Sequence, residues 1–287
     1  MIIRETREQV LNSVSPVMKA EGLTKIYGIG CPVCRESTGP GFETNMCRRC
    51  GSVVACGDIS FELYPDEVLG IVGESGSGKS TLVKLLYFDS EATHGAIYIN
   101  DSADNVLSLS PFQKRRIRNS CMGMVYQNPH YGLRMEVSSG GNISERLIMA
   151  GWRNIAAMRE RASYLLKKTE IPVLRIDEPP ANFSGGEQQR VQISKALSNN
   201  PLILFLDEVT TGLDLSVQAR VLDLIRDLQS DLHLSVIVVS HDLGVIRLLT
   251  TRTMVMKYGR VVESGLTDQI LEDPQHHYTQ LLVSSQL

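Results

Sequence analysis

The sequence is poor in aromatic residues and contains no long hydrophobic run. Aromatic residues make up 6% of its 287 residues, with a single tryptophan. None of its apolar runs approaches the roughly 20 residues that a membrane-spanning helix needs, so any membrane role would require partner subunits. The formal net charge is only −3, which gives no overall attraction to nucleic acid or to an anionic membrane surface. We therefore expect no nucleic-acid partner and no direct membrane insertion.

The N-terminal residues do not resemble an export signal. Charged side chains occur from Arg4 onward, where a secretion signal would have an apolar stretch. We therefore expect a cytoplasmic protein, whose six cysteines would be metal ligands or buried thiols before they would be disulfides. With 43% hydrophobic residues, the chain can bury a large core as one big domain or as two closely joined subdomains.

A glycine-rich turn over residues 73–81 carries the strongest signal in the sequence. It matches the pattern G-x-x-x-x-G-K-[ST], follows the apolar run 68–72 and opens into a helix-forming run, which is the context of a phosphate-binding P-loop. Glycines let backbone N–H groups line a concavity for an anion, and the helix N-terminus adds its positive dipole end. We expect Lys79 to reach the β- and γ-phosphates of a nucleoside triphosphate and Ser80 to place its hydroxyl on Mg²⁺. The predicted nucleotide contacts in this loop are Gly73, Ser75, Gly76, Gly78, Lys79, Ser80 and Thr81.

Two C-x-x-C pairs lie between residues 31 and 50. They are Cys31 with Cys34 and Cys47 with Cys50, separated by twelve residues rich in Gly, Pro, Ser and Thr. Two such pairs can complete a tetrahedral site that leaves no position open for substrate, and so small a segment would take its order from the metal. We predict a structural zinc, with an iron–sulfur centre or a redox pair as the alternatives. Cys56 and Cys121 stand alone and are predicted to be buried apolar residues.

Two further apolar runs end in polar residues that suit a nucleotide site. Residues 202–206 have the pattern of a fully buried strand that delivers Asp207 and Glu208 to its carboxyl end, where ligands bind in parallel α/β sheets. We expect Asp207 to hold Mg²⁺ through its water shell and Glu208 to polarise the attacking water. The second run, 236–239, leads to His241, which is predicted to contact phosphate, although a lone histidine is commonly structural.

A mostly helical segment, residues 128–183, in which helices are predicted to begin at Asn142 and at Ile155, leads to a second candidate phosphate surface. Ser184 lies at the start of a predicted helix that runs to about residue 198, with Glu187 three residues later as in a capping box. A capping box accounts for these two residues but gives no reason for Gly185 and Gly186. An exposed helix N-terminus with free N–H groups can bind phosphate, so Ser184 and the two glycines are predicted contacts.

Alternating apolar residues predict a second set of strands near the N-terminus. Residues 17–26, 58–63 and 95–99 have strand patterns, and a polar segment with weak helical character, 1–16, precedes them. Tyr27 ends the first of these strands and is our candidate for stacking on the purine base of the nucleotide. The alternative is that it only packs, as a tyrosine at a strand end commonly does.

Together these motifs resemble those of ATP-binding-cassette ATPases over nearly the whole chain from Val17 onward, apart from the cysteine segment. The P-loop, Gln127, the 184–188 signature, the Asp207-Glu208 pair, the segment 212–214 and His241 occur in the order and spacing of that superfamily. The resemblance implies an α/β P-loop NTPase with a RecA-like core, an antiparallel β-subdomain and a helical subdomain, to which the small Cys₄ zinc knuckle is added.

The resemblance also implies a head-to-tail dimer with two ATP molecules at its interface, formed with a second copy or with a sister cassette protein. In each site the P-loop of one subunit would face the signature serine and glycines of the other. Gln127 would contact Mg²⁺ and report its presence to the helical subdomain. His241 would hold the γ-phosphate, and Asp214 would couple the two sites.

The implied organisation is an N-terminal extension over 1–16 and a cassette ATPase domain over 17–287. Within that domain we place the Cys₄ metal-binding insertion at 28–56 and the helical subdomain at 128–199. Two positions depart from the pattern of the superfamily. Glu187 stands where the signature usually has glutamine, and Val209 stands where proline often follows the catalytic glutamate. Neither change touches the residues expected to meet phosphate, so neither predicts an inactive enzyme.

Within the superfamily, residues 132–147 and 262–268 look like those of the ATPase subunit of the carbon–phosphorus lyase system for phosphonate breakdown. Such subunits dock on a soluble lyase core, so lyase subunits are the implied partners. Residues 273–282 are shared with dipeptide-importer ATPases, which leaves a subunit of a dipeptide- or nickel-type importer as the alternative. A zinc-bearing DNA-repair ATPase is disfavoured by the acidic net charge. A docking scaffold with a vestigial site is disfavoured by the complete set of catalytic residues.

Overall fold

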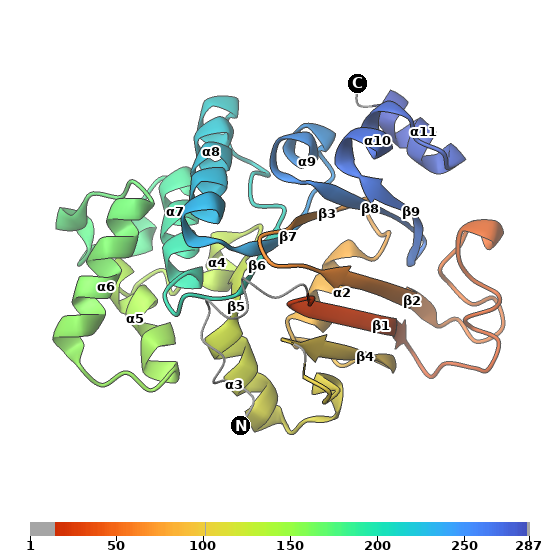
Figure 1. Cartoon of the computed structure of the whole chain (residues 1–287), viewed down its shortest axis with the longest axis horizontal. Coiled ribbons are helices and arrows are strands. Elements are labelled where there is room, and N and C mark those ends of the chain that lie inside the picture. The colour runs from red at the N-terminus through yellow and green to blue at the C-terminus, as the bar shows by residue number, and fades with distance from the viewer. Residues whose placement is uncertain (1–14, 101, 286–287) are drawn as a thin grey trace. The chain divides into compact units, whose positions relative to one another are not determined.

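The computed structural model describes residues 15–100 and 102–285 (Figure 1). The extension predicted over residues 1–16, with its weak helical character, lies almost wholly outside these ranges. The chain divides into two compact units, one made of Met1–Lys114 with Ile237–Leu287 and the other of Arg115–Val236. We call them the P-loop unit and the signature unit, after the motif that each carries.

An antiparallel sheet in the P-loop unit has the strand order β2-β1-β4. Its strands are β1 (Met18–Tyr27), β2 (Val53–Leu63) and β4 (His94–Ile99). The register of β1 with β2 ends where Tyr27 pairs with Val53. Strand β2 begins at Val53 instead of the predicted Asp58, because the apolar run 53–56 continues the pairing with the end of β1. The last residues of the predicted insertion, 28–56, are therefore part of the sheet.

A second sheet of this unit contains the strand that leads into the P-loop. Strand β3 (Val68–Val72) pairs in parallel with β8 (Arg252–Lys257), which pairs antiparallel with β9 (Arg260–Leu266). All five residues of β3 are buried, as its continuous apolar run predicts. The described helices of the unit are α2 (Lys79–Leu86), α9 (Leu243–Leu249), α10 (Thr267–Glu272) and α11 (His277–Ser284), with short 3-10 turns η1 (Pro40–Phe42) and η2 (Val106–Ser108). Helices α9 and α10 pack against these strands (Figure 1).

The signature unit is mostly helical and contains a short pair of parallel strands, β5 (Met122–Val125) and β6 (Ile203–Asp207). Its described helices are α4 (Pro129–Gly132), α5 (Ser139–Met149), α6 (Ile155–Lys168), α7 (Gly185–Ala196) and α8 (Leu215–Leu232), with 3-10 turns η3 (Val173–Arg175) and η4 (Pro180–Asn182). Helices α5, α6 and α7 pack against one another. Helix α3 (Pro111–Cys121) and strand β7 (Ser235–Val239) lie where the chain enters and leaves the unit.

Helix α5 begins earlier than its sequence pattern predicts. The hydroxyl of Ser138 accepts a hydrogen bond from the N–H of Gly141 over 3.1 Å, so the helix starts at Ser139 and not at Asn142. Two glycines in this first turn carry no side chain that could show the apolar periodicity of a helix, which is why the pattern alone places the start too late.

The mixed α/β architecture confirms the predicted fold class, including an antiparallel β-sheet and a mostly helical unit. Cys56 and Cys121 are both buried, as predicted, at 0% and 7% exposure. In the described part of the chain, no helix combines the length and the apolar character that crossing a membrane would require.

Candidate functional site

The glycine-rich turn of the P-loop unit is packed tightly between two backbones. Gly73, Gly76 and Gly78 have φ angles of 149°, 80° and 106°, which residues with side chains rarely adopt. A Cβ atom on Gly78 would lie 2.1 Å from the carbonyl oxygen of Ala55 in β2. One on Gly73 would lie 2.2 Å from the carbonyl oxygen of Met256 in β8. Glycine is therefore required at both of these positions.

Lys79 is the first residue of helix α2 and is almost fully buried, with 5% of its surface exposed. Its ammonium group donates hydrogen bonds to the carbonyl oxygens of Gly73 at 2.6 Å and Glu74 at 2.9 Å. A buried ammonium group at a helix N-terminus is suited to an anion with several oxygen atoms. Ser80 and Thr81 follow in the first turn of α2, so the predicted phosphate contacts from Gly73 to Thr81 form one continuous segment.

His241 lies at the edge of the sheet from which the P-loop starts. The N–H of Ser240, at the end of β7, donates a hydrogen bond to the carbonyl oxygen of Ile71 in β3 over 3.3 Å. Because Ile71 comes two residues before Gly73, this contact puts His241 at the carboxyl end of the strand beside β3. The His241 side chain is exposed there, which fits a ligand contact better than a buried structural role.

Tyr27 ends strand β1 with 45% of its surface exposed. The ammonium nitrogen of Lys25 lies 5.1 Å from the centre of its ring. A tyrosine that only fills the core would be buried, so this exposure favours the prediction that the ring stacks on a base.

The four cysteines between β1 and β2 form one cluster, in the segment that extends beyond these strand ends in Figure 1. All four Sγ atoms lie within 4.8 Å of one another. The Sγ–Sγ distances are 3.4 Å for Cys31–Cys34, 3.7 Å for Cys31–Cys47 and 3.4 Å for Cys34–Cys50. Zn–S bonds of about 2.3 Å place tetrahedral sulfur atoms about 3.8 Å apart, so the donor set and its spacing fit a single ion.

The two innermost cysteines of this cluster differ in acidity. Burial raises the pKa of the Cys34 thiol to about 12. The Ser37 hydroxyl, 3.6 Å from the Sγ atom of Cys47, and the backbone N–H groups of Cys50 and Arg49 lower the pKa of the Cys47 thiol to about 6. The thiol of Cys47 is therefore ionised more readily than that of Cys34, and the thiolate is the form of cysteine that binds metal.

In the signature unit, parallel pairing brings Gln127 and the two acidic residues to one edge. Val125 at the end of β5 pairs with Leu206 in β6. Gln127 comes two residues after Val125 and Asp207 comes directly after Leu206, and ligands bind at this carboxyl edge in parallel sheets. Glu208 has a φ angle of 49°, a left-handed conformation that is uncommon for residues other than glycine and that recurs at functional sites.

The signature helix α7 begins with the predicted capping box. The N–H of Ser184 donates to the Glu187 carboxylate over 2.9 Å, and the N–H of Glu187 donates to the Ser184 hydroxyl over 3.4 Å. Gly186 has a packing reason as well, since a Cβ atom there would lie 2.3 Å from the Cγ1 atom of Val217 in α8. Gly185, by contrast, has only an ordinary contact with Leu213, at 3.7 Å.

Glu187, the residue that departs from the usual signature, has a partner that the sequence did not suggest. Its carboxylate accepts a hydrogen bond from the guanidinium of Arg175 over 2.6 Å. Burial raises the pKa of Glu187, but the hydrogen bonds from Ser184 and the charge of Arg175 outweigh it and hold the pKa below its usual value. The Arg175 guanidinium also lies over the ring of Phe183, 3.9 Å from its centre. The other departure, Val209, is an apolar side chain in a buried position, with 3% exposure.

Two glutamines of α7 form hydrogen bonds with the backbone of Tyr126, the residue before Gln127. Neither of them was identified from the sequence. The Gln192 side chain accepts a hydrogen bond from the N–H of Tyr126 at 2.8 Å and donates one to its carbonyl oxygen at 3.1 Å. Gln189 donates a further hydrogen bond to the same carbonyl at 3.3 Å. Both glutamines are 1% exposed. They share a helix face with Ile193 and Ala196, and glutamines on an apolar face of a predicted helix are the sequence signal that could have indicated them.

A hollow of about 500 Å³ in the signature unit brings together two of its nucleotide-site candidates, Gln127 and Gly185. Its lining includes Gln127, Gly185, Gln189, Val209 and Leu213. Asp214, the next residue, occupies the N-cap position of α8 but makes no side-chain capping hydrogen bond there. Gln127, the signature glycine and the loop after Glu208 therefore share one surface.

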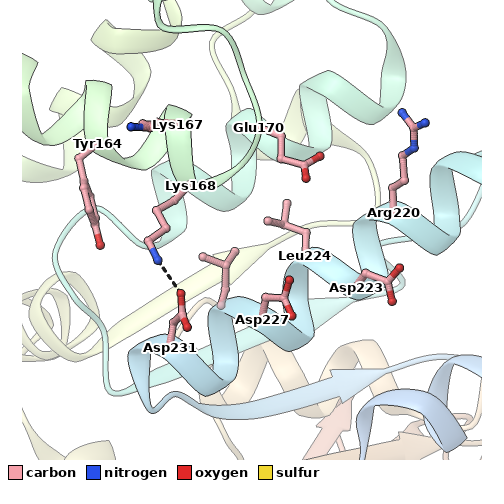
Figure 2. A pocket seen from close by; sticks show the side chains of 10 residues that line it. Tyr164, Lys167, Lys168, Glu170, Arg220, Asp223, Leu224, Asp227 and Asp231 are labelled. Atoms are coloured by element: carbon pink, nitrogen blue, oxygen red, sulfur yellow. Dashed lines mark hydrogen bonds and ion pairs between the residues drawn. The ribbon is translucent and has the colours of Figure 1, made fainter.

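A larger groove of about 790 Å³ runs between α6 and α8 and contains none of the predicted site residues (Figure 2). Figure 2 shows charged side chains along both of its walls, with an ion pair between Lys168 and Asp231 at 2.5 Å. The side chains of this pair are 36% and 53% exposed. Exposed ion pairs of this kind contribute little and indicate a solvated surface, so we assign no chemistry to this groove.

Comparison with known proteins agrees with this geometry. The chain is similar to PhnK of Escherichia coli (strain K12), whose name describes an ATP-binding protein of phosphonate utilisation. The two are 52% identical over 230 residues, which cover 80% of this chain and 90% of PhnK. It is also 34% identical over 271 residues to the dipeptide transport ATP-binding protein DppF of Haemophilus influenzae, covering 94% of this chain and 78% of DppF.

Among solved structures, the chain resembles the dimeric ATP-binding cassette MJ0796 in a post-hydrolysis state bound to ADP and Pi. The TM-score is 0.72 at 27% sequence identity, and the match covers 87% of this chain and 98% of that one. The model of the ABC transporter family matches residues 56–211. This match spans more than half of the chain, which therefore belongs to the ABC transporter family as an ATP-hydrolysing nucleotide-binding subunit.

Proposed function

We propose that the chain couples ATP binding and hydrolysis to conformational change in a soluble carbon–phosphorus lyase complex, which breaks down phosphonates in the cytoplasm. The observation that carries this proposal is the 52% identity with PhnK, a protein of phosphonate utilisation, over 90% of its length. The 132–147 segment, where an importer ATPase would meet its permease, is part of the same resemblance.

The 132–147 segment has the internal bonding of a preformed docking surface. Asn142 is fully buried, accepts a hydrogen bond from the N–H of Arg134 at 2.8 Å and donates others to the carbonyl oxygens of Arg134 and Val137 at 3.0 and 2.9 Å. Glu145 links Arg134 at 2.8 Å with Lys195 of α7 at 2.7 Å. A partner that binds this turn would therefore be connected directly to the signature helix.

Each nucleotide site would have two halves, and this chain would provide the first. Lys79 and the P-loop N–H groups would hold the β- and γ-phosphates, and Ser80, Gln127 and Asp207 would hold Mg²⁺, which supplies charge neutralisation at the phosphates. Glu208 would orient the attacking water and His241 would contact the γ-phosphate. Ser80, Gln127 and Asp207 fit the metal because they offer hydroxyl, amide and carboxylate oxygens, which hard cations prefer. Lys79 and the P-loop N–H groups fit the phosphates because they are donors at a helix N-terminus.

The second half of each site would come from another cassette. Ser184, Gly185 and Gly186 would contact the γ-phosphate bound by the partner, and Asp214 would couple the two sites across the interface. Support comes from the open position of Gly185 at the start of α7 and from the resemblance to the dimeric cassette MJ0796. The partner would be a second copy of this chain or a sister cassette.

Zinc would occupy the Cys₄ cluster. Four sulfur donors at near-tetrahedral spacing with no position left open are typical of a structural site. A redox pair would need only two of these thiols, whereas all four Sγ atoms lie within 4.8 Å of one another, which favours a shared ion.

A second candidate function is the nucleotide-binding subunit of a dipeptide- or nickel-type importer, which the 34% identity with DppF over 94% of this chain favours. Purification of the tagged native chain and identification of the associated subunits separates the two. Copurifying lyase subunits are expected, whereas a membrane permease without lyase subunits would reject the first proposal. In the purification, Asn142→Ala should lose the partner while ATP binding persists, and Asn154→Ala, which alters only the cap of α6, should keep it.

A further inference from the structure

The Cys₄ cluster is joined to the nucleotide site through very short connections. Residues 28–30 link Tyr27 to Cys31, and residues 51–52 link Cys50 to Val53. Tyr27 and Val53 are themselves the terminal pair of the β1–β2 ladder. Strand β1, which ends at the adenine-stacking candidate Tyr27, is therefore separated by three residues from the first cysteine pair. The second cysteine pair is separated by only two residues from the start of β2.

The connections touch one another. The N–H of Gly30 donates a hydrogen bond to the Ser52 hydroxyl over 3.0 Å. A Cβ atom on Gly28 would lie 2.7 Å from the same oxygen atom, so the residue after Tyr27 is pressed against the residue before Val53. Neither connection can move by itself without disturbing the other.

The second cysteine pair is also bonded to the start of β2. The N–H of Cys47 donates to the carbonyl oxygen of Ser52 over 2.8 Å, and the N–H of Val54 donates to that of Asn45 over 2.8 Å. Cys34, Cys47 and Val54 form a small buried cluster, against which Ile26 packs. The core of the cysteine segment thus includes the neighbours of Tyr27 and Val53 in the sheet.

We propose that a metal ion bound by the four cysteines fixes the Tyr27–Val53 end of the sheet and thereby sets the affinity of the site for the adenine end of the nucleotide. This rests on the proposed ATP site, with Tyr27 as its stacking residue. So short a segment has little order without its metal. When the ion leaves, the terminal pair loses the support of an ordered segment on its outer side, and the Tyr27 ring loses its fixed position.

The phosphate end of the site is supported separately. Strand β2 meets the P-loop further along, where Ala55 lies against Gly78. There the N–H of Gly57 donates to the carbonyl oxygen of Gly259 over 2.8 Å, and the N–H of Gly259 donates to that of Ser77 over 2.9 Å. These contacts lie inside a strand that continues to Leu63, so loss of the metal should leave phosphate binding intact.

One brace on the cysteine segment does not depend on the metal. The Arg260 guanidinium of β9 donates hydrogen bonds to the carbonyl oxygens of Gly57 at 2.8 Å and Arg35 at 2.7 Å. Neither acceptor belongs to residues 27–30, so this hydrogen bonding keeps residue 35 attached to the unit. Metal removal should therefore loosen the Tyr27 end without detaching the whole segment.

The test compares two ligands of the full-length chain by calorimetry, ATP and inorganic tripolyphosphate, which has no base. Stripping the metal with a chelator should weaken ATP binding about tenfold, the scale of one base–aromatic stack, and restoring Zn²⁺ should reverse the loss. Tripolyphosphate binding should not change. Cys50→Ser, which removes the exposed ligand, should behave as the stripped protein, and Cys121→Ser, which removes a cysteine outside the cluster, should behave as the wild type.

The variant Tyr27→Ala tests whether the metal affects ATP binding through the Tyr27 ring. In metal-loaded protein it should weaken ATP binding as much as stripping does, and stripping the variant should cause no further loss. Unchanged ATP affinity after stripping, equal loss of both ligands, or full additivity of stripping with Tyr27→Ala would each overturn the inference. Failure of the metal-loaded wild type to bind either ligand would instead overturn the proposed ATP site itself.

Discussion

The backbone N–H of Glu74 in the P-loop donates a hydrogen bond to the hydroxyl of Tyr278 in the C-terminal helix α11, over 3.0 Å. Tyr278 is 3% exposed, and the ammonium nitrogen of Lys257 lies 4.4 Å from the centre of its ring. Burial raises the pKa of Tyr278 above its usual value, so the hydroxyl stays neutral at physiological pH. The C-terminal helix α11 therefore helps to position the P-loop.

Tyr278→Phe should loosen the P-loop. The ring and its contact with Lys257 remain, but one net hydrogen bond of about 1 kcal/mol is lost, equivalent to roughly 2–4 °C in melting temperature and about fivefold in ATP affinity. Thermal melts and ATP titration measure the two effects. Tyr164→Phe, on an exposed tyrosine of α6, is the matched control. Melting temperature and ATP affinity that both equal those of the wild type would show that the contact has no role.

Contacts of this kind mark the limit of what sequence patterns predict. The P-loop, the capping box at Ser184 and the strand that ends in Asp207 are local patterns, because a turn, a helix start or a buried strand is encoded in neighbouring residues. The bond between Glu74 and Tyr278 joins residues 204 positions apart. No local periodicity specifies which tail residue reaches the loop.

The same reasoning applies to the buried polar side chains. Gln192 looks like an ordinary polar residue of a helix, and only the packed structure shows that it satisfies both backbone groups of Tyr126. Likewise, the start of β2 could not be separated from the cysteine segment by pattern, since Val53 belongs to both. In both cases the structure depends on contacts between residues that are far apart in the sequence, which local patterns do not show.

Substitutions of Glu208 and Lys79 should have different effects, the first on ATP hydrolysis and the second on ATP binding. Glu208→Gln keeps the shape of the side chain but removes the carboxylate that would orient water, so ATP should stay bound while turnover falls by about 10²–10⁴. With ATP and Mg²⁺ this variant should accumulate as a dimer, measured by light scattering. Lys79→Ala removes the buried ammonium group and should lose ATP affinity and the dimer with it. ATP turnover that survives in both variants would refute these roles, and Glu91→Gln, on an exposed acid, is the control.

Metal analysis tests the Cys₄ cluster directly. Protein purified under reducing conditions should contain about one zinc per chain, and Cys31→Ser and Cys47→Ser should each release it, because three sulfur ligands no longer complete the tetrahedron. Cys121→Ser should keep the metal. Full-length protein that binds no metal would reject the site, and iron with a visible absorption spectrum would assign it to an iron–sulfur centre.

The pair formed by Glu187 and Arg175 should make stability depend on pH. The folded state lowers the pKa of Glu187 below its ordinary value of 4.5, so the stabilisation is fully present above about pH 4.5 and is lost as the pH falls through the lower, folded value. Both side chains are about a quarter exposed, so screening limits the effect of the charge to about 1 kcal/mol or less.

Glu187→Gln isolates this charge, because its amide oxygen can still accept the hydrogen bond from Ser184. In urea unfolding, the wild type should be more stable than the variant at pH 7, and the difference should shrink below pH 4.5. Arg175→Gln should remove the same interaction, so the double variant should lose less stability than the sum of the two single changes. A difference that stays constant between pH 7 and pH 3, or strict additivity, would show that the charge pair is not the source. ATP turnover of Glu187→Gln should persist, since glutamine is the usual residue of the signature and the serine and glycines expected to meet phosphate are unchanged.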